Sequence, residues 1–250
     1  MKKSIIFILF SFFAVVAMAA TGKAKLMEAN VEYKNKNFET AANLYEEILK
    51  EGESAAIFYN LGNAYYELGK LAPAILNYER ALLRDPGNED IRHNLELAYS
   101  QTVDRIEPVG RFFLLKWIDG LSSLYSTNAW AYISIISFII TLMLAGAFVF
   151  ARVGWMKKIA FFAGIATLII TLSAFGFSNK QKNRLIIHDY AILFSPTVTI
   201  KGSPDASGKE LFLLHEGTKV KIKRTLGNWI EIQSLDGNVG WVESSVLEMI

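Results

Sequence analysis

The side chains that could do chemistry are few and widely spaced along this chain of 250 residues. Its three histidines, His93, His188 and His215, lie in three different contexts, and none has a second ligand at the spacing of a helical metal site. The chain contains no cysteine, so it has no thiolate nucleophile, disulfide or cysteine-ligated metal. The sequence therefore predicts no metal site.

One glycine-rich stretch partly matches a phosphate-binding loop. Five residues separate Gly202 from Gly208 where the motif has four, and Glu210 stands where a hydroxyl is required. Neither Gly-x-Ser-x-Gly nor His-Glu-x-x-His occurs. We expect a non-enzymatic protein without catalytic residues or cofactor.

Other side chains are suited to binding rather than to reaction. Amide, hydroxyl and aromatic groups recur on what we predict to be the concave face of a helical array, where they could bond the backbone of a peptide. The predicted partner-binding residues are Asn30, Tyr33, Tyr59, Asn60, Asn63, Tyr66, Glu67, His93 and Asn94. The alternative for each is an ordinary solvated helix face.

The element that positions these residues is a repeat, because residues 55–88 resemble residues 22–54. The second copy carries the tetratricopeptide pattern at positions 4, 7, 8, 11, 20, 24, 27 and 32 of its 34 residues, as Phe58, Leu61, Gly62, Tyr65, Ala74, Tyr78, Ala81 and Pro86. Small residues let paired helices approach, and large ones fill the gap to the next unit. We predict an all-α repeat domain over residues 20–107, capped by a helix from Asp90 to Arg105.

Two apolar runs are long enough to cross a bilayer, which needs roughly 20 residues. We predict spans at 128–151 and 159–177, forming a hairpin with a loop at 152–158. The loop carries Arg152, Lys157 and Lys158, which favours the cytoplasmic side, although Lys180, Lys182 and Arg184 follow the second span. Residues 178–188 are predicted as a linker.

The chain before the spans carries two further signals for membranes and export. Residues 1–19 read as a signal peptide ending in Ala17-Met18-Ala19, or alternatively as an uncleaved anchor. Residues 108–127 are predicted to form an interfacial helix anchored by Trp117 and Trp130, with an ordinary packing helix as the alternative. Residues 108–184 hold eight basic residues and one acidic residue, while the flanking domains are acidic. This layout suits a membrane protein rather than a nucleic-acid binder.

Residues 189–250 show short β-rich runs between turns, including the hairpin signal Asp236-Gly237-Asn238, and predict a small all-β barrel. The stretches 213–218, 227–229 and 240–242 resemble the bacterial SH3 domain, and the resemblance implies recognition of peptides or cell-wall stem peptides. Tyr190, Trp229 and Trp241 are a candidate ligand shelf. The alternative places the two tryptophans in the core.

The order of these modules resembles the BatE-type proteins of the Bat (Bacteroides aerotolerance) operon. That resemblance implies an inner-membrane protein that acts with Bat partners carrying von Willebrand A domains and contributes to aerotolerance or oxidative-stress resistance. We therefore expect a scaffold with a periplasmic repeat domain and a periplasmic barrel. The alternative is a membrane anchor that binds peptidoglycan through its SH3-like domain.

Overall fold

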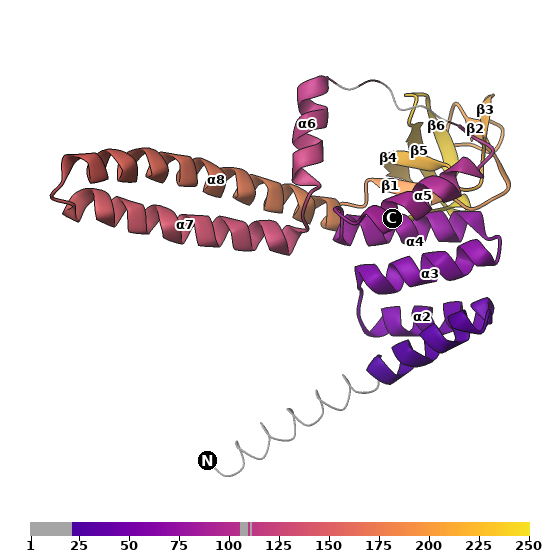
Figure 1. Cartoon of the computed structure of the whole chain (residues 1–250). Helices are drawn as coiled ribbons and strands as arrows, with labels where there is room; N and C mark the ends of the chain where they lie inside the picture. Colours follow the sequence, from indigo (N-terminus) through magenta and orange to yellow (C-terminus); the bar gives the residue numbers. More distant parts are fainter. Residues whose placement is uncertain (1–21, 106–109, 111) are drawn as a thin grey trace, which may run out of the picture. The chain divides into compact units, whose positions relative to one another are not determined.

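The computed structural model describes residues 22–105, 110 and 112–250, so the expected signal peptide lies outside the described residues. The chain forms two compact units. Of the described residues, the first unit combines 22–82, 89–105 and 190–250, and the second combines 83–88, 110 and 112–189. The helical repeats and the barrel therefore belong to one unit, although the second unit separates them in sequence (Figure 1).

The repeat domain is a series of antiparallel helices. Residues 22–34 are helical and are followed by α2 (Phe38–Glu51), α3 (Ala55–Glu67), α4 (Leu71–Arg84) and α5 (Glu89–Ser100). Gly62 allows α3 and α4 to approach, because a Cβ atom there would lie 2.7 Å from two ring atoms of buried Tyr78. The expected all-α repeat fold is confirmed, with a small residue where the repeat pattern requires one.

The capping helix differs from the prediction, since α5 ends at Ser100 and not at Arg105. The hydroxyl of Thr102 donates to the carbonyl oxygen of Tyr99 at 2.8 Å, which caps the helix end. Thr102 and Asp104 then pack against the barrel instead of continuing the helix.

The C-terminal domain is a seven-stranded antiparallel sheet with strand order β3-β2-β6-β5-β4-β1-β7. The strands are β1 (Tyr190–Leu193), β2 (Thr197–Lys201), β3 (Glu210–His215), β4 (Lys219–Leu226), β5 (Trp229–Ser234), β6 (Val239–Glu243) and β7 (Leu247–Met249). The predicted hairpin at Gly237, whose φ is 97°, joins β5 to β6 and is confirmed. Gly240 lets β6 pass close to β2, because a Cβ atom there would collide with Ile200 Cγ2.

The second unit contains α6 (Phe113–Ser122), α7 (Thr127–Phe150) and α8 (Gly154–Ile186). The predicted loop 152–158 is shorter in the structure, and α8 continues through most of the predicted linker 178–188. Residues 178–186 include no proline or glycine, so the end of the apolar run does not end the helix.

Hydroxyl groups join α7 to α8 along their contact face. Ser137 Oγ lies 2.9 Å from Thr171 Oγ1, Thr141 Oγ1 donates to Thr167 Oγ1 at 2.8 Å, and Ser134 Oγ donates to the Thr171 carbonyl oxygen at 3.2 Å. The most apolar windows of these helices are only 11% and 17% buried, whereas the core helix of a soluble protein would be mostly covered. Their length and exposed apolar surface are consistent with membrane insertion.

Candidate functional site

The predicted partner-binding asparagines form hydrogen-bonded junctions between successive repeats. Asn30 Oδ1 accepts from the Tyr45 hydroxyl at 2.7 Å, and Asn63 Oδ1 accepts from the Tyr78 hydroxyl at 2.8 Å. Each asparagine also accepts from an asparagine of the following unit: Asn60 donates to Asn30 at 3.4 Å, and Asn94 donates to Asn63 at 2.9 Å. The same pairing thus occurs twice, one repeat apart.

These contacts give the asparagines a structural role that the sequence did not reveal. Burial raises the pKa of Tyr45 to about 12 and also raises that of Tyr78, so both phenols are protonated donors near neutral pH. Removal of Asn63 would leave the buried Tyr78 hydroxyl without this acceptor, at a cost of about 1–3 kcal/mol.

The other predicted partner-binding residues differ in how much of their surface is exposed. The Tyr59 hydroxyl accepts from Asn94 at 3.0 Å, the Tyr66 hydroxyl accepts from Gln101, and Tyr33 makes an edge contact with Phe38. Each of these tyrosines is half-buried. Glu67 and His93 are exposed, and they offer a partner an acidic group and an imidazole.

The barrel brings together two of its three predicted shelf residues. Trp229 and Trp241 lie on one face of neighbouring strands, since Trp229 pairs with Glu243 and Glu231 pairs with Trp241. Trp241 is buried beneath the Arg224 guanidinium, 5.1 Å from the ring centroid, and Arg224 is paired with Glu231 at 2.9 Å.

Tyr190 lies elsewhere on the barrel. It belongs to β1, which β4 and β5 separate from β6, and its ring lies 4.9 Å from Lys219 Nζ. Trp229 is half-buried and is the more accessible of the two tryptophans. A ligand surface on this face would therefore centre on Trp229, apart from Tyr190.

The barrel is bonded to the repeats by residues that were not among the predicted site residues. Asp104 accepts from the backbone N–H of His215 at 2.6 Å and from the Thr218 hydroxyl at 2.7 Å, and it lies 2.8 Å from His215 Nδ1. Partial burial opposes ionisation of Asp104, but the bonds from His215 and Thr218 prevail and lower its pKa.

A second group of contacts starts from α4. Buried Glu79 accepts from Lys219 Nζ at 2.6 Å and from the Tyr99 hydroxyl at 2.7 Å. Burial, with Glu79 adding to it, raises the pKa of Tyr99 well above its ordinary value. Arg80 bonds the Glu248 carboxylate at 3.1 Å and the Met249 carbonyl oxygen at 2.7 Å, so α4 contacts the last strand of the barrel as well as Lys219 of β4.

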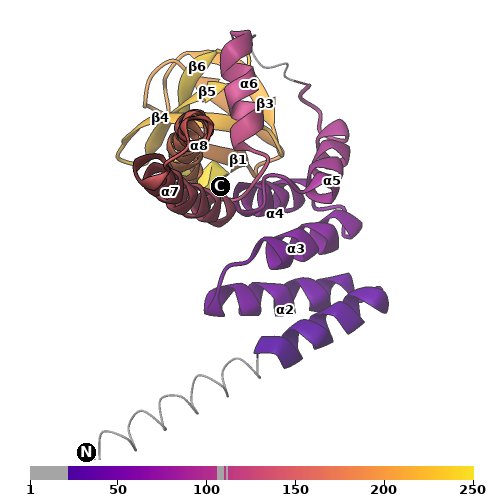
Figure 2. The same cartoon turned by 60° about the vertical axis from the view of Figure 1, so that its left-hand side comes forward.

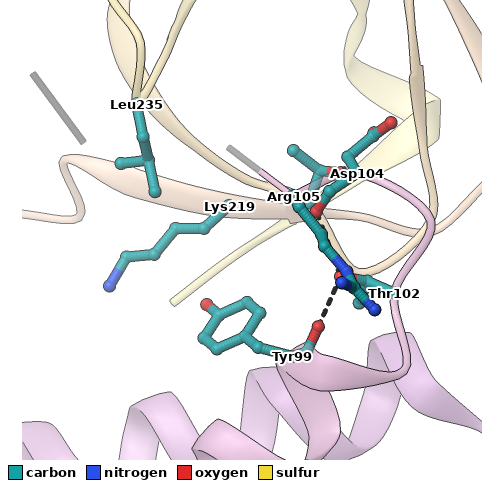
Figure 3. Close-up of a pocket in the computed structure, with 7 residues that line it drawn as sticks. Tyr99, Thr102, Asp104, Arg105, Lys219 and Leu235 are labelled. Atoms are coloured by element: carbon teal, nitrogen blue, oxygen red, sulfur yellow. Dashed lines mark hydrogen bonds between the residues drawn. The ribbon is translucent and has the colours of Figure 1, made fainter. Parts of the chain in front are cut away.

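A cavity of about 340 Å³ lies at this junction (Figure 3). It is lined by Tyr99, Thr102, Asp104, Arg105, Thr218, Lys219 and Leu235. Its acidic group, Asp104, already binds the barrel, and Lys219 is paired with Glu79. Among the described residues there is also no cluster of three or more histidine, aspartate or glutamate side chains that could hold a metal ion.

Comparison with protein families identifies both domains. A tetratricopeptide repeat model matches residues 26–89, and a bacterial SH3 domain model matches residues 196–248. No curated protein shows significant similarity to the chain. Domains of both families are typically non-catalytic interaction modules. Their presence indicates protein interaction, and it is also compatible with cell-wall binding.

Proposed function

We propose that this protein is a non-enzymatic, membrane-anchored adaptor whose repeat domain and barrel form one partner-binding body. The contacts across the domain junction carry the proposal. Asp104 with His215, Glu79 with Lys219, and Arg80 with Glu248 join residues that precede the hairpin to residues that follow it. Such contacts need both domains on the same side of a bilayer, and two spans provide that arrangement.

The side of the membrane follows from the charges on the loop between the spans. Arg152, Lys157 and Lys158 favour a cytoplasmic loop, so the repeats and the barrel would be periplasmic on the inner membrane. A signal peptide over residues 1–19 would produce the same orientation.

The repeat groove would hold the partner, an extended peptide or a helix, against Tyr66, Glu67 and His93. The resemblance to BatE-type proteins suggests Bat proteins with von Willebrand A domains as partners, and a role in aerotolerance or oxidative-stress resistance. A single pair of repeats offers a small surface, so the membrane anchor would strengthen binding by raising the effective concentration.

Affinity purification from membranes tests the groove. The variant Glu67→Ala/His93→Ala removes exposed groups and keeps the asparagine junctions, so it should fold normally and lose most of a co-purifying partner. Asn43→Ala, an exposed change on α2, is the matched control. Equal recovery of the partner with both variants would remove the groove from the proposal.

A second candidate function is anchoring to peptidoglycan through the barrel. It is favoured by partly exposed Trp229 next to the Trp241, Arg224 and Glu231 cluster. The full chain should bind purified peptidoglycan, and Trp229→Ala should weaken that binding, whereas Leu213→Ala, an exposed change on β3, which β2 and β6 separate from β5, should not. Absence of binding by the unmodified chain would rule this function out.

A further inference from the structure

Helix α6 has two chemically different faces. At about 100° per residue, Phe113, Leu114, Trp117, Ile118 and Leu121 fall on one side of the helix. Lys116, Asp119 and Ser122 fall on the other side, where Leu115 is the apolar exception. This division raises the question of what each face contacts.

The polar face is bound to α8. Asp119 pairs with Lys180 and lies 3.4 Å from Arg184, while Gln181 Nε2 donates to the Ser122 carbonyl oxygen at 2.6 Å. The indole N–H of Trp130, on α7, donates to the same carbonyl oxygen at 2.9 Å. The polar face is therefore fastened to both helices of the hairpin.

The apolar face is left uncovered by the described part of the chain. Trp117 is 71% exposed and Phe113 is 67% exposed, and the other three residues of this face are also exposed. Contiguous apolar surface of this kind marks an interaction site. The inverse arrangement, with apolar residues against α8 and charges outward, would be expected of a helix that simply packs on its neighbour.

The position of α6 indicates what covers this face. In both views α6 runs across the axis of the α7 and α8 pair, near the C-terminal end of α8 (Figures 1 and 2). That end of α8 carries Lys180, Lys182 and Arg184. Lys180 and Arg184 follow Phe177, the last residue of the apolar run, by at most two helical turns, or about 10 Å. The headgroup layer on each side of a bilayer is about 5–8 Å thick, so α6 lies close to this depth.

We propose that α6 is an in-plane membrane helix whose apolar face inserts at the boundary between lipid headgroups and acyl chains. Lipid is the occupant that fits best, because α6 is continuous with the spans and because an exposed tryptophan suits this layer. Lys116, on the opposite face, would remain near the phosphates. The inference needs α7 and α8 to cross a bilayer, but it does not depend on any partner of the repeats.

The lack of cysteine in this chain allows a direct test. The full chain would be labelled with an environment-sensitive fluorophore at Trp117→Cys or Leu121→Cys and placed in phosphatidylcholine and phosphatidylglycerol vesicles. Lipids spin-labelled near the headgroup should quench these two positions several-fold more than Lys223→Cys on the barrel. Leu142→Cys, within α7, should respond instead to lipids labelled deep in the acyl chain.

The possible outcomes distinguish lipid from water and from protein as the material in contact with the apolar face of α6. Labels on α6 that aqueous iodide quenches as strongly as it quenches the Lys223→Cys label would overturn the proposal, because the face would then lie in water. Labels shielded from both iodide and lipid quenchers would also overturn it and would point to a second copy or another protein. If the Leu142→Cys label does not respond to lipid, the failure lies in membrane insertion and therefore in the proposed function.

Discussion

Asp104 makes three polar contacts from the end of the repeats to the barrel. It accepts two hydrogen bonds from His215 and Thr218 at 2.6 and 2.7 Å, while its other oxygen contacts the His215 ring. Arg80 and Glu79 also bond the barrel, Arg80 through Glu248 and Met249 and Glu79 through Lys219. Loss of Asp104 would leave several partially buried donors without an acceptor.

The substitution Asp104→Ala should therefore weaken the junction by about 1–3 kcal/mol. Hydrogen exchange of the amides from His215 to Lys219 should accelerate by about tenfold for each 1.4 kcal/mol lost. Glu96→Ala removes an exposed acidic group from α5 and serves as the control with the same charge change. Unchanged protection in Asp104→Ala would show that the junction is held elsewhere.

The same carboxylate predicts a pH dependence. The pKa of Asp104 is lower in the folded protein, so its contribution is complete above its unfolded pKa of about 3.9 and is lost as pH falls through the folded value. Protection at His215 to Lys219 should fall in this acidic range in the unmodified chain. Asp104→Ala should lack the part of the decrease that arises from this group.

Gly62 provides a second prediction for a single residue. A methyl group there would collide with the buried Tyr78 ring at 2.7 Å, which should outweigh the gain in helix propensity of about 1 kcal/mol. We expect Gly62→Ala to destabilise the repeats by about 1–3 kcal/mol, measured by urea unfolding. Gly52→Ala meets no atom within 4 Å and should unfold like the unmodified chain.

The role of Gly62 could be predicted from the sequence and that of Asp104 could not, for different physical reasons. The small residue at Gly62 follows from a local repeat pattern, which fixes its neighbour Tyr78 on the next helix. The partner of Asp104 lies 111 residues later, beyond two apolar helices, and no local pattern links the two positions. Asn30 and Asn63 were predicted as partner-binding residues, but their bonds to Tyr45 and Tyr78 depend on side-chain directions that spacing does not supply.

Among the elements, the helical hairpin owes its pairing to hydroxyl groups as well as to small side chains. Ala160 and Ala174 are buried on α8, and Thr171 bonds across to Ser137. In membranes such bonds contribute about 0.6 kcal/mol each, because lipid supplies no hydrophobic drive between helices. Removal of one of these hydroxyl groups should therefore weaken the pairing of α7 with α8 slightly and should not abolish it.

We expect Thr141→Val combined with Thr171→Val to reduce the free energy of separating α7 from α8 by about 1–2 kcal/mol. Steric trapping in bilayer micelles measures this quantity. Ser173→Ala changes an exposed hydroxyl on the same helix and should have no effect. A similar loss in both variants would mean that the hydroxyl contacts between α7 and α8 are not specific.

Composition predicts the apolar span but does not predict where the helix that contains it begins and ends. The apolar run predicted the span at 159–177, yet α8 extends from Gly154 to Ile186, because hydropathy reports the membrane and not the limits of the helix. The charged extension then supplies Lys180, Gln181 and Arg184 as partners for α6. In the barrel, by contrast, turn residues mark where a strand ends, as Gly237 does between β5 and β6.

For the whole molecule, the main feature is that the barrel packs on the last helices of the repeat array, where a further repeat would otherwise cover them. Helix α5 starts a third unit, and among the described residues the next helix is α6 of the other compact unit. Gly217, at a φ of 81°, lies so close to Ile75 and Thr102 that a Cβ atom would approach their side chains to 3.0 and 2.8 Å. The turn between β3 and β4 thus packs where a further repeat would be expected to continue.

The proposed topology makes a prediction at this scale. A reporter that is active only outside the cytoplasm should be active when fused after Ile250 and inactive when inserted at Arg152. A cytoplasmic reporter should give the opposite pattern at the two sites. Activity of the same reporter at both positions would contradict the hairpin, and an active cytoplasmic fusion after Ile250 would reverse the proposed orientation.

The order of the repeats, the apolar helices and the barrel could be predicted from the sequence. The association of the repeats with the barrel could not. Each module has its own local signature, whereas the contact between Glu79 and Lys219 joins positions 140 residues apart. Both side chains would ordinarily be expected in solvent.

The contact of Gly217 with Ile75 and Thr102 also constrains the sequence of events during synthesis. The ribosome completes the helical repeats first, and the strands that shield their last surface emerge only after the hairpin has been translated. Until then the nascent chain exposes the side of α4 that carries Ile75, which a chaperone could bind. A chain halted just after α8 should therefore be more prone to proteolysis than the finished protein.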